Sequence, residues 1–590
     1  MLNIGKLARG QQDYYLNSVA RGVEDYYVGA GEAPGYWLGG GAADLGLAGH
    51  VRELELTPVL EGRDSSTGEA MSHRHHKARM PGFDLTFRAP KSVSLVHALG
   101  PKEASNEVIN AHDSAVLLAL DYLERHTAVG RRGTDGVIPI DSTGFVAAAF
   151  RHRTSRAGDP LLHTHVLVAN LIHGDDGKWS ALDGRLLYSH AKTAGYLYQA
   201  QLRKELTRRL GVEWTQVRNG TAETEGIPRA AINEFSRRRA EIEIRMEQRG
   251  EQSARAAQVA TLDTRRAKDH GVRPEGLQPE WERRAADVGL TRKDLKRTLG
   301  RSRANFRTLS SDLADELFGP DGLTRDASSF TVREVIQALC ERRGSGVSAA
   351  QIEKEANELL ESDLVIRLSA AKSDFLLTST SLRLGNGQVV PSVNDATRYS
   401  TKEMLRLEER LIRRAIDRQG DSVAVADKTA LKSALTRRHS LSSEQRRMVE
   451  NLTCSGLGVE VVVGKAGTGK TFALDAARGV WESSGVKVIG CALSARAAKE
   501  LEAGSGIESS TIAALIKDLD DWNTPGLERD SVVIVDEAGM VGTRQLDALL
   551  SHSGELVAGS PRHRRQRGEE ISEWAVGAAA SLAVQKLAVE

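Results

Sequence analysis

The stretch "FRHRTSRAGDPLLHTHVLVANL", residues 150–171, holds three histidines within two runs of strand-forming residues. Side chains two residues apart on a β-strand point to the same face, so His163 and His165 project together while Thr164 points to the other side. His152 lies on the preceding run, across a polar loop that contains residues 158–160. A hairpin across that loop is expected to bring three imidazoles to one face of a sheet.

Two interpretations of this histidine cluster are open from these residues alone. Three neutral imidazoles make an open metal site whose free positions accept a phosphate oxygen. Half-buried histidines with a structural role are the commoner explanation of a His-x-His pattern on a strand. A second group, His73, His75 and His76 in "SHRHHKARM", has no strand register, and we expect it to be solvated.

Size and composition limit the class of protein. At 590 residues the chain is long enough for several domains, each with its own core. Its 40% apolar and 27% charged residues are typical of a soluble protein. The net charge of +1 gives no global signal for nucleic acid, so any such signal must be local.

The cysteines and the chain ends suggest a cellular compartment. The three cysteines are far apart, show no metal-ligand spacing and suit a reducing cytoplasm; they are Cys340, Cys454 and Cys491. "MLNIGKLARG" lacks the build of a signal peptide, and the apolar run "WAVGAAASLAV" is too short to cross a bilayer. We therefore expect a soluble cytoplasmic protein without a membrane segment.

The first half of the chain divides into two parts by pattern. Residues 1–215 mix strands and helices, and "DLTFRAPKSVSLVHAL" and "TGFVAAAFRH" are expected to form buried strands. Residues 216–310 are charged and mostly helical, with arginines at 237–239 and 265–266. These arginines form either a solvated helix face or a phosphate-binding surface.

The second half begins with a small helical region. Residues 328–400 show two helical patterns, "TVREVIQALCERR" and "SAAQIEKEANELLE", followed by short strands, which suggests a winged-helix-like module. Residues 401–417 predict a strongly amphipathic helix. Strands and helices alternate in residues 441–590, as in α/β folds.

Four of the ten tyrosines form two adjacent pairs near the N-terminus, Tyr14–Tyr15 and Tyr26–Tyr27. Taken alone, they indicate aromatic packing on an amphipathic helix. Together with the histidine hairpin and "FDLTFRAPKSVS", they resemble the MobF-type conjugative relaxases, the TrwC/TraI-like members of the HUH endonuclease class. The likeness covers residues 1–300, keeps the order of the motifs and includes "ATLDTRRAKD" at residues 260–269.

The resemblance implies a DNA transesterase. A tyrosine oxygen attacks a phosphodiester of single-stranded transfer-origin DNA, which leaves a 5′-phosphotyrosine and a free 3′-OH. Because a phenol has a pKa near 10, its ionisation at neutral pH costs about 4 kcal/mol. A divalent ion (Mg²⁺, Mn²⁺ or Zn²⁺) on His152, His163 and His165 is expected to stabilise charge in the transition state. Asp84, in "GFDLTF", matches the family's acid that helps to activate the nucleophile.

The tyrosine spacing adds a constraint on this mechanism. By position, Tyr14 matches the first nucleophile and Tyr26 the second, with Tyr15 and Tyr27 as their neighbours. On one straight helix the two pairs would lie about 18 Å apart. Because one ion cannot serve both at once, we expect them to act in sequence, and Gly22 is a candidate bend.

Three arginines near the histidines are candidates for binding DNA. Arg151, Arg153 and Arg156 flank the imidazoles in the sequence. They are expected either to contact phosphates beside the scissile bond or to be solvated loop charges.

A phosphate-binding loop appears in "VEVVVGKAGTGKTFALDAA", after an apolar segment expected to be a strand and before a helix. Its Walker A residues are Gly464, Gly467, Gly469, Lys470 and Thr471. Lys470 is expected to reach the β- and γ-phosphates of ATP and Thr471 to bind Mg²⁺. "SVVIVDEAGM" adds Asp536 for Mg²⁺ and Glu537 to position water. Gln445, in "LSSEQRRMV", is similar to the adenine-reading residue of superfamily 1B helicases.

A complete helicase of that group needs more chain than follows these motifs. After Glu537 come 590 − 537 = 53 residues, and a basic run with Arg562, Arg564, Arg565 and Arg567 stands where the group's next motif is expected. We therefore expect ATP binding with a truncated helicase that is not a functional motor.

The predicted architecture has three parts. Residues 1–300 form an α+β HUH relaxase domain with an antiparallel sheet and helices, residues 301–440 a helical and winged-helix-like region, and residues 441–590 a partial α/β RecA-like P-loop domain. The expected partners are transfer-origin DNA, an accessory DNA-binding protein and a coupling ATPase. An origin-DNA-binding ATPase without cleavage activity, or a non-enzymatic remnant of a mobile element, remains the alternative.

Overall fold

The computed structural model describes residues 1–7, 35–71, 80–132, 138–155, 157–249, 274–302, 311–368, 397–464, 467–521, 526–528 and 531–554. Contacts divide the chain into two compact units. The first consists of Met1–Leu313, Thr331–Ser362 and Leu368–Arg398, and the second of Ala314–Phe330, Asp363–Arg367 and Tyr399–Glu590. The division into three domains expected from the sequence stays a prediction.

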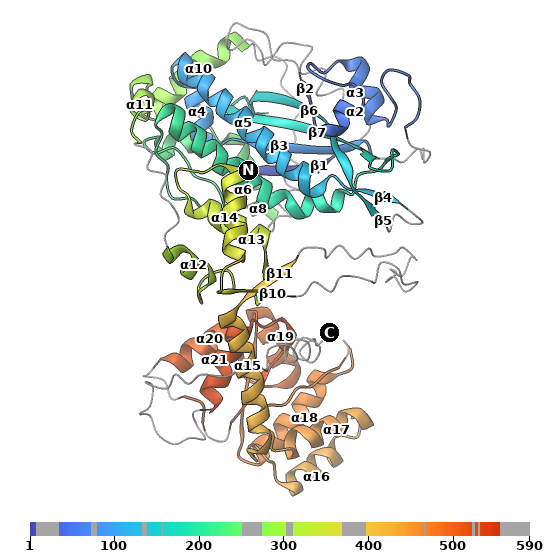
Figure 1. The fold of residues 1–590 in the computed structure, drawn as a ribbon. Coiled ribbons are helices and arrows are strands. Elements are labelled where there is room, and N and C mark those ends of the chain that lie inside the picture. Colours follow the sequence, from blue (N-terminus) through green and yellow to red (C-terminus); the bar gives the residue numbers. More distant parts are fainter. Residues whose placement is uncertain are drawn as a thin grey trace. The chain divides into compact units, whose positions relative to one another are not determined.

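An antiparallel sheet organises the first unit (Figure 1). Its strands are β1 (Leu2–Lys6), β3 (Gly82–Arg88), β7 (Pro160–Gly174), β6 (Ser142–Thr154) and β2 (Tyr36–Leu38) in spatial order, with β8 (Trp179–Ser180) beside β7. The long strands β6 and β7 form the hairpin expected around the histidines, and the short turn 155–159 joins them. A two-stranded ribbon, β4 (Gly130–Arg132) with β5 (Ile138–Ile140), lies apart from this sheet.

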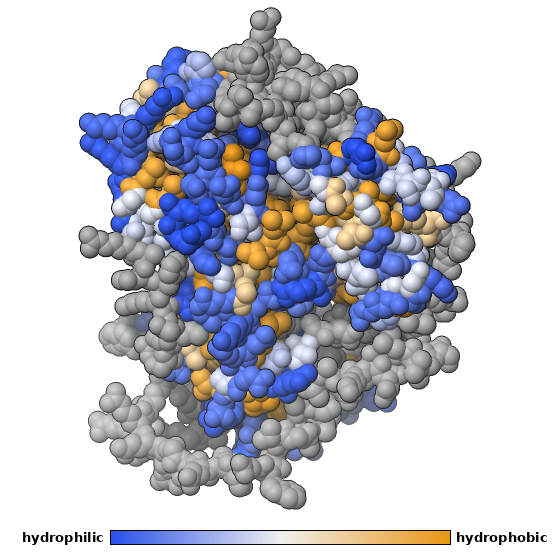
Figure 2. Space-filling view, turned by 45° about the horizontal axis from the view of Figure 1, so that its top comes forward, coloured by the Kyte–Doolittle hydropathy of each residue, from blue (hydrophilic) through white to orange (hydrophobic). Residues whose placement is uncertain are grey.

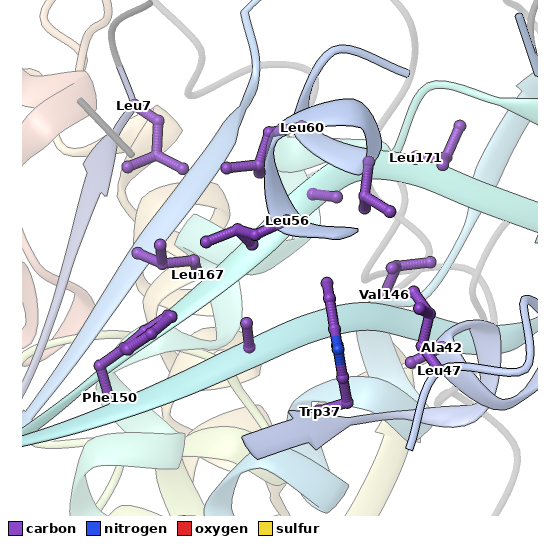
Figure 3. Packing of buried hydrophobic residues seen from close by; sticks show 13 residues of the cluster. Leu7, Trp37, Ala42, Leu47, Leu56, Leu60, Val146, Phe150, Leu167 and Leu171 are labelled. Atoms are coloured by element: carbon purple, nitrogen blue, oxygen red, sulfur yellow. The ribbon is translucent and has the colours of Figure 1, made fainter. Parts of the chain in front are cut away.

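Each face of the sheet is covered by helices. The helices α4 (Lys91–Leu99), α5 (Lys102–Thr127) and α6 (Gly184–Leu210) pack on one face, and α2 (Gly40–Asp44) and α3 (Glu53–Leu60) on the other. Figure 3 shows the second face, where Trp37, Leu56 and Phe150 belong to one apolar cluster. Alternate residues of β6 and β7 supply this cluster, and the histidines continue the same alternation toward the turn.

The segment 84–99 folds differently from the sequence expectation. Only its first part is a strand, β3, and "KSVSLVHAL" forms the helix α4. Pro90 occupies the N-cap position with an extended backbone, which ends the strand and starts the helix. Nearly every residue of α4 is buried, so its apolar pattern lacks the alternation that separates a buried helix from a buried strand.

Helices also follow α6 in the first unit. These are α7 (Arg229–Glu234), α8 (Arg237–Arg249), α10 (Pro274–Asp287), α11 (Arg292–Arg297), α13 (Val332–Arg342) and α14 (Ala349–Leu360). Thr331 and Glu334 form a capping box that starts α13, and Ser348 caps α14. The two helical patterns predicted for 331–361 are therefore confirmed. A separate three-stranded sheet has the order β10 (Val365–Leu368), β11 (Arg398–Thr401), β9 (Phe330–Thr331), and most of its residues belong to the second unit.

The second unit contains an α/β domain. A parallel sheet of β13 (Ser509–Thr511), β12 (Lys487–Ala492) and β14 (Ser531–Val535) carries helices around it. The helices of this unit are α12 (Ser311–Phe318), α15 (Lys402–Asp417), α16 (Lys428–Arg437), α17 (Ser443–Cys454), α18 (Lys470–Ser483), α19 (Ala495–Ser505), α20 (Ile512–Asp520) and α21 (Thr543–Gly554), with short 3₁₀ turns at Arg418–Gly420 and Ala538–Met540. The predicted amphipathic helix is α15.

One expectation about this unit is wrong. The apolar segment before the phosphate loop, residues 459–463, is not a strand. Val461 and Val463 are exposed, and no described residue forms a β-ladder with this segment. An apolar strand is stabilised by pairing and by cover on its faces, and the segment has neither among the described residues. No helix of the described residues is long and apolar enough to cross a membrane.

Candidate metal centre and nucleotide site

Three imidazoles converge near the turn between β6 and β7. One ring nitrogen each of His152, His163 and His165 lies within 4.8 Å of the others. The ring centroids are 5.1–5.2 Å apart, and His152 stands directly opposite His163 in the strand register. His152 and His163 are buried, and His165 is half-buried. The predicted cluster is therefore formed by the hairpin, with a donor set that suits a divalent cation.

Hydrogen bonds from the far side of two rings set their orientation. His163 Nδ1 lies 2.9 Å from the Leu161 carbonyl oxygen, and His165 Nδ1 lies 2.8 and 3.0 Å from the two carboxylate oxygens of Asp84. Because carbonyl and carboxylate oxygens only accept, each Nδ1 carries the proton and donates it. The Nε2 atoms of His163 and His165 are then the unprotonated nitrogens that face a metal.

The protonation state of His163 also suits metal binding. Burial, assisted by the neighbouring rings of His165 and His152, holds the pKa of His163 well below 6.5. The ring is therefore neutral at physiological pH, and neutral imidazole is the form that binds a metal.

The structure changes the position expected for two arginines. Consecutive residues of a strand alternate between faces, so Arg151 points away from His152. Arg153 lines a space beside α4 and α5. Arg151 forms an ion pair with Asp113 of α5 on the opposite face. Neither arginine lies beside the histidines, and their role in DNA binding stays a prediction. Arg156 lies outside the described residues, as do Tyr14, Tyr15, Tyr26, Tyr27 and the second histidine group, His73, His75 and His76.

Two residues of β3 were missed by the sequence reasoning. Thr86 pairs with His165 in the sheet, and its hydroxyl lies 3.3 Å from both His165 Nδ1 and Asp84 Oδ1. Arg88 stands opposite His163 on the same face and is exposed, so it is a cation beside the cluster. The sequence could have indicated both residues, because Asp84, Thr86 and Arg88 alternate along one strand and therefore share a face.

The phosphate loop leads into α18. Gly469 precedes the helix with a φ of 76°, and Gly467 has a φ of 79°; both values favour glycine. The ammonium of Lys470 donates to the carbonyl of Gly464 across the loop. Gln445 Nε2 donates to the carbonyl of Thr468 at 3.0 Å, so the predicted adenine-reading residue contacts the loop itself.

The acidic pair lies at the carboxyl end of β14. Asp536 follows the strand, and its backbone N–H donates to Cys491 of β12 at 3.0 Å. Its carboxylate accepts from the Glu537 N–H at 3.0 Å, and Glu537 has a φ of 52°. Lys465 and Ala466 of the loop lie outside the described residues.

Comparison with known families matches both parts of the chain. Residues 8–288 match the family model of the TrwC relaxase, and residues 440–558 match that of an AAA domain. The multifunctional conjugation protein TraI of Escherichia coli (strain K12) is 36% identical over 329 residues, which is 51% of this chain and 18% of that protein. The conjugal transfer protein TraA of Rhizobium radiobacter is 31% identical over 285 residues, 47% of this chain and 23% of that protein.

A solved structure is also similar in sequence. The conjugative relaxase TrwC in complex with oriT DNA, in a metal-bound structure, is 31% identical, with 49% of this chain and 99% of that chain covered and a TM-score of 0.44. The present chain spans about a fifth of the length of the curated relatives. By its residues 8–288 the chain belongs to the TrwC family of conjugative relaxases, and it carries an AAA domain at residues 440–558.

Proposed function

We propose that this protein nicks transfer-origin DNA at one site of one strand, as a conjugative relaxase. The observation that carries the proposal is the convergence of three imidazoles with Asp84 behind one of them. The family match over residues 8–288 and the conjugation proteins among the relatives support it. Its substrate is single-stranded or supercoiled transfer-origin DNA in the bacterial cytoplasm, and its further partners are an accessory DNA-binding protein and a coupling ATPase.

The histidines supply a metal site in this proposal. His152, His163 and His165 hold a divalent cation (Mg²⁺, Mn²⁺ or Zn²⁺), which polarises the scissile phosphate. Asp84 keeps the proton of His165 on Nδ1 and so presents Nε2 to the site. Arg88 adds positive charge on the same face, where a phosphate approaches.

The tyrosines supply the nucleophiles. The phenolic oxygen of Tyr14 forms a bond to phosphorus while the bond to the 3′ oxygen breaks, which leaves a 5′-phosphotyrosine and a free 3′-OH. Tyr26 repeats the exchange to end the transfer, and Tyr15 and Tyr27 support their neighbours. Asp84 is also the proposed acceptor of the phenolic proton, although its carboxylate already accepts from His165.

The AAA domain binds ATP with Mg²⁺ in this proposal. Lys470 and Thr471 contact the phosphates and the ion, Asp536 holds Mg²⁺, Glu537 positions water, and Gln445 reads adenine. That the helicase part is incomplete as a motor stays a prediction.

Covalent trapping tests the relaxase proposal. The full chain is incubated with single-stranded transfer-origin DNA and Mg²⁺ or Mn²⁺, then denatured and examined by gel electrophoresis and mass spectrometry. We expect a protein–DNA adduct on a tyrosine, reduced in Tyr14→Phe and lost when all four tyrosines are phenylalanine.

The other outcomes favour the alternatives. DNA retardation without an adduct indicates an origin-DNA-binding ATPase without cleavage activity. Neither binding nor adduct indicates a remnant of a mobile element. Either result overturns the proposal.

A further inference from the structure

A cavity of about 720 Å³ lies on the opposite face of the sheet from the histidines. It is bordered by the end of α4, the start of α5, strand β6 and the helices α10 and α11. Five cationic side chains line it, against the single carboxylate of Glu103; they are Lys102, Arg153, Arg292, Lys293 and Lys296. Figure 2 shows hydrophilic residues over much of the left of the view, the side on which Figure 1 places α10 and α11.

Different elements of the fold place these cations around the cavity. Arg153 of β6 lines this space together with His97 of α4. Helix α11 starts at a capping box of Thr291 and Asp294 and is anchored by the buried Leu295. Its lysines 293 and 296 are then exposed at the rim of the cavity.

Most of this charge is not neutralised within the described part of the chain. There, no carboxylate lies within ion-pair distance of Lys102, Lys293 or Lys296, whereas Arg292 pairs with Glu282 at 2.6 Å. The first turn of α5, a helix of 26 residues, also borders the cavity and adds the positive end of its dipole. The cavity is therefore suited to an anion.

Two further lining side chains, His97 and Trp281, are buried. His97 is buried and lies 2.7 Å from the Ser105 hydroxyl, and burial, assisted by Arg153, lowers the pKa of His97 to about 4. Trp281 closes the wall but is itself buried, with its indole N–H donating to Gly158 at 2.9 Å. Among the described residues that line the cavity, no aromatic face is exposed for stacking, which favours a ligand held by its charge.

The ligand is best matched by a phosphodiester chain. Several separate cations around one cavity are typical of grooves that follow a nucleic-acid backbone. Because Arg153 is the neighbour of His152, the cavity and the histidine cluster lie back to back at the same end of β6.

We propose that this cavity binds the phosphate backbone of the single DNA strand, a few nucleotides from the phosphate that the histidines hold. The inference rests on the proposed function, since it assumes that the histidine site takes DNA. It adds a second, sequence-independent contact region on the other face of the sheet.

The test measures the salt dependence of binding. The full-length double variant K293Q/K296Q is titrated with fluorescent oligothymidylate of about 10 and about 30 nucleotides at several salt concentrations. Each lost phosphate contact lowers the salt slope for a single strand by about 0.7, so we expect a decrease of about 1.4 with the long oligonucleotide. Its affinity is expected to fall about tenfold.

The control removes the same charge elsewhere in the first unit. K192Q/K354Q changes exposed lysines of α6 and α14 and is expected to keep the wild-type slope and affinity. R153Q probes the interior of the cavity, and its circular dichroism and melting temperature show whether it is folded. A folded R153Q is expected to weaken binding of the long oligonucleotide in the same way.

The outcomes separate this inference from the proposed function. If the wild type forms the tyrosyl adduct but K293Q/K296Q and R153Q bind the long oligonucleotide with the wild-type slope, the cavity does not bind the strand. The inference is also overturned if inorganic tripolyphosphate binds the cavity while the affinity for the oligonucleotide is unchanged in the variants. If the wild type forms no adduct, the proposed function of the histidine site fails, and this result is distinct from a failure of the cavity to bind DNA.

Discussion

Individual side chains around the histidine cluster do different physical work. The Leu161 carbonyl accepts a hydrogen bond from His163 Nδ1, and the Asp84 carboxylate accepts one from His165 Nδ1. These two acceptors determine which ring nitrogen faces the proposed metal. On the other face of β7, Thr164 accepts or donates a hydrogen bond with His112 at 2.8 Å, and His112 contacts the Tyr198 hydroxyl at 2.8 Å. Neighbouring residues of β7 therefore face different surroundings: His163 and His165 face the candidate metal site, and Thr164 faces a buried hydrogen-bond network.

Replacing Asp84 should weaken metal binding. Asp84→Ala removes the acceptor that orients His165, and loss of such a partner typically reduces metal affinity about 10- to 100-fold. Asp84→Asn keeps an acceptor oxygen and should lose less. Calorimetric titration with Mn²⁺ measures both, and Asp113→Asn on the opposite face is the matched control. Equal affinity in Asp84→Ala and the wild type would show that Asp84 does not support the site.

The buried histidine His112 should make the first unit acid-sensitive. Burial, with a contribution from Arg151, lowers the pKa of His112 to about 3 from an ordinary value of 6.5. Between these values the unfolded chain binds a proton that the folded chain does not. Stability is therefore complete above pH 6.5 and falls with decreasing pH, by at most about 1.4 kcal/mol per pH unit from this residue.

The variant His112→Gln tests that sign. It should be less stable at pH 7, because the hydrogen bonds of His112 to Thr164 and Tyr198 are lost or altered, by about 1–2 kcal/mol. Its urea midpoint should change less than that of the wild type between pH 7 and pH 5. His439→Gln, at an exposed position of the second unit, should keep the wild-type sensitivity. A steeper pH dependence in His112→Gln would contradict the argument.

At the scale of elements, the β6–β7 turn is held from outside the hairpin. Asp159 in the turn is 1% exposed and accepts from Arg284 of α10 at 3.2 Å and from Arg237 at the start of α8 at 2.8 Å. Arg284 also pairs with Glu234 at 2.8 Å and lies over the Phe235 ring. Two helices thereby fix the end of the hairpin that carries the histidines, and Arg237 has a structural role instead of being only a solvated charge.

Removing the turn carboxylate should destabilise this arrangement. Asp159→Ala leaves Arg284, which is buried, without one of its partners, and breaking a buried pair costs about 3–5 kcal/mol. Chemical denaturation of the full chain measures the loss in the transition of the first unit. Glu243→Ala, which removes the exposed partner of Arg239, should cost at most about 1 kcal/mol. Equal losses in the two variants would show that the turn is not held by this pair.

At the scale of the whole molecule, the chain combines two chemistries in separate compact units. The histidine cluster belongs to the first unit and the phosphate loop to the second. Each site is built from residues of its own unit, since Asp84 and the histidines lie in one and Gln445, Gly464 and Lys470 in the other. We therefore expect metal binding and nucleotide binding to be separable.

Two variants measure this separation. Lys470→Ala should reduce affinity for a fluorescent ATP analogue by at least about tenfold, because it removes the lysine proposed to contact the phosphates. It should leave Mn²⁺ affinity unchanged. His165→Ala should have the opposite pattern. Loss of both affinities in either variant would indicate that the two sites depend on one another.

The sequence alone determined those features that depend on neighbours along the chain. The period of two in a strand brought His163 and His165 to one face, and the short polar loop brought His152 opposite them. Helical patterns predicted α13 and α14, and the glycine pattern predicted the phosphate loop before α18. These are local rules of backbone geometry, so they are readable without the fold.

Tertiary structure decided which distant residues meet. Asp84 reaches His165 across 81 residues because β3 pairs with β7 in one particular register, and Arg284 reaches Asp159 across 125 residues because α10 packs at the turn. It also assigned α4 a helical form, since a segment buried on all sides has no periodic pattern to read. Register between separated strands and helix docking depend on the packing of the whole core, a long-range property that spacing in the chain does not encode.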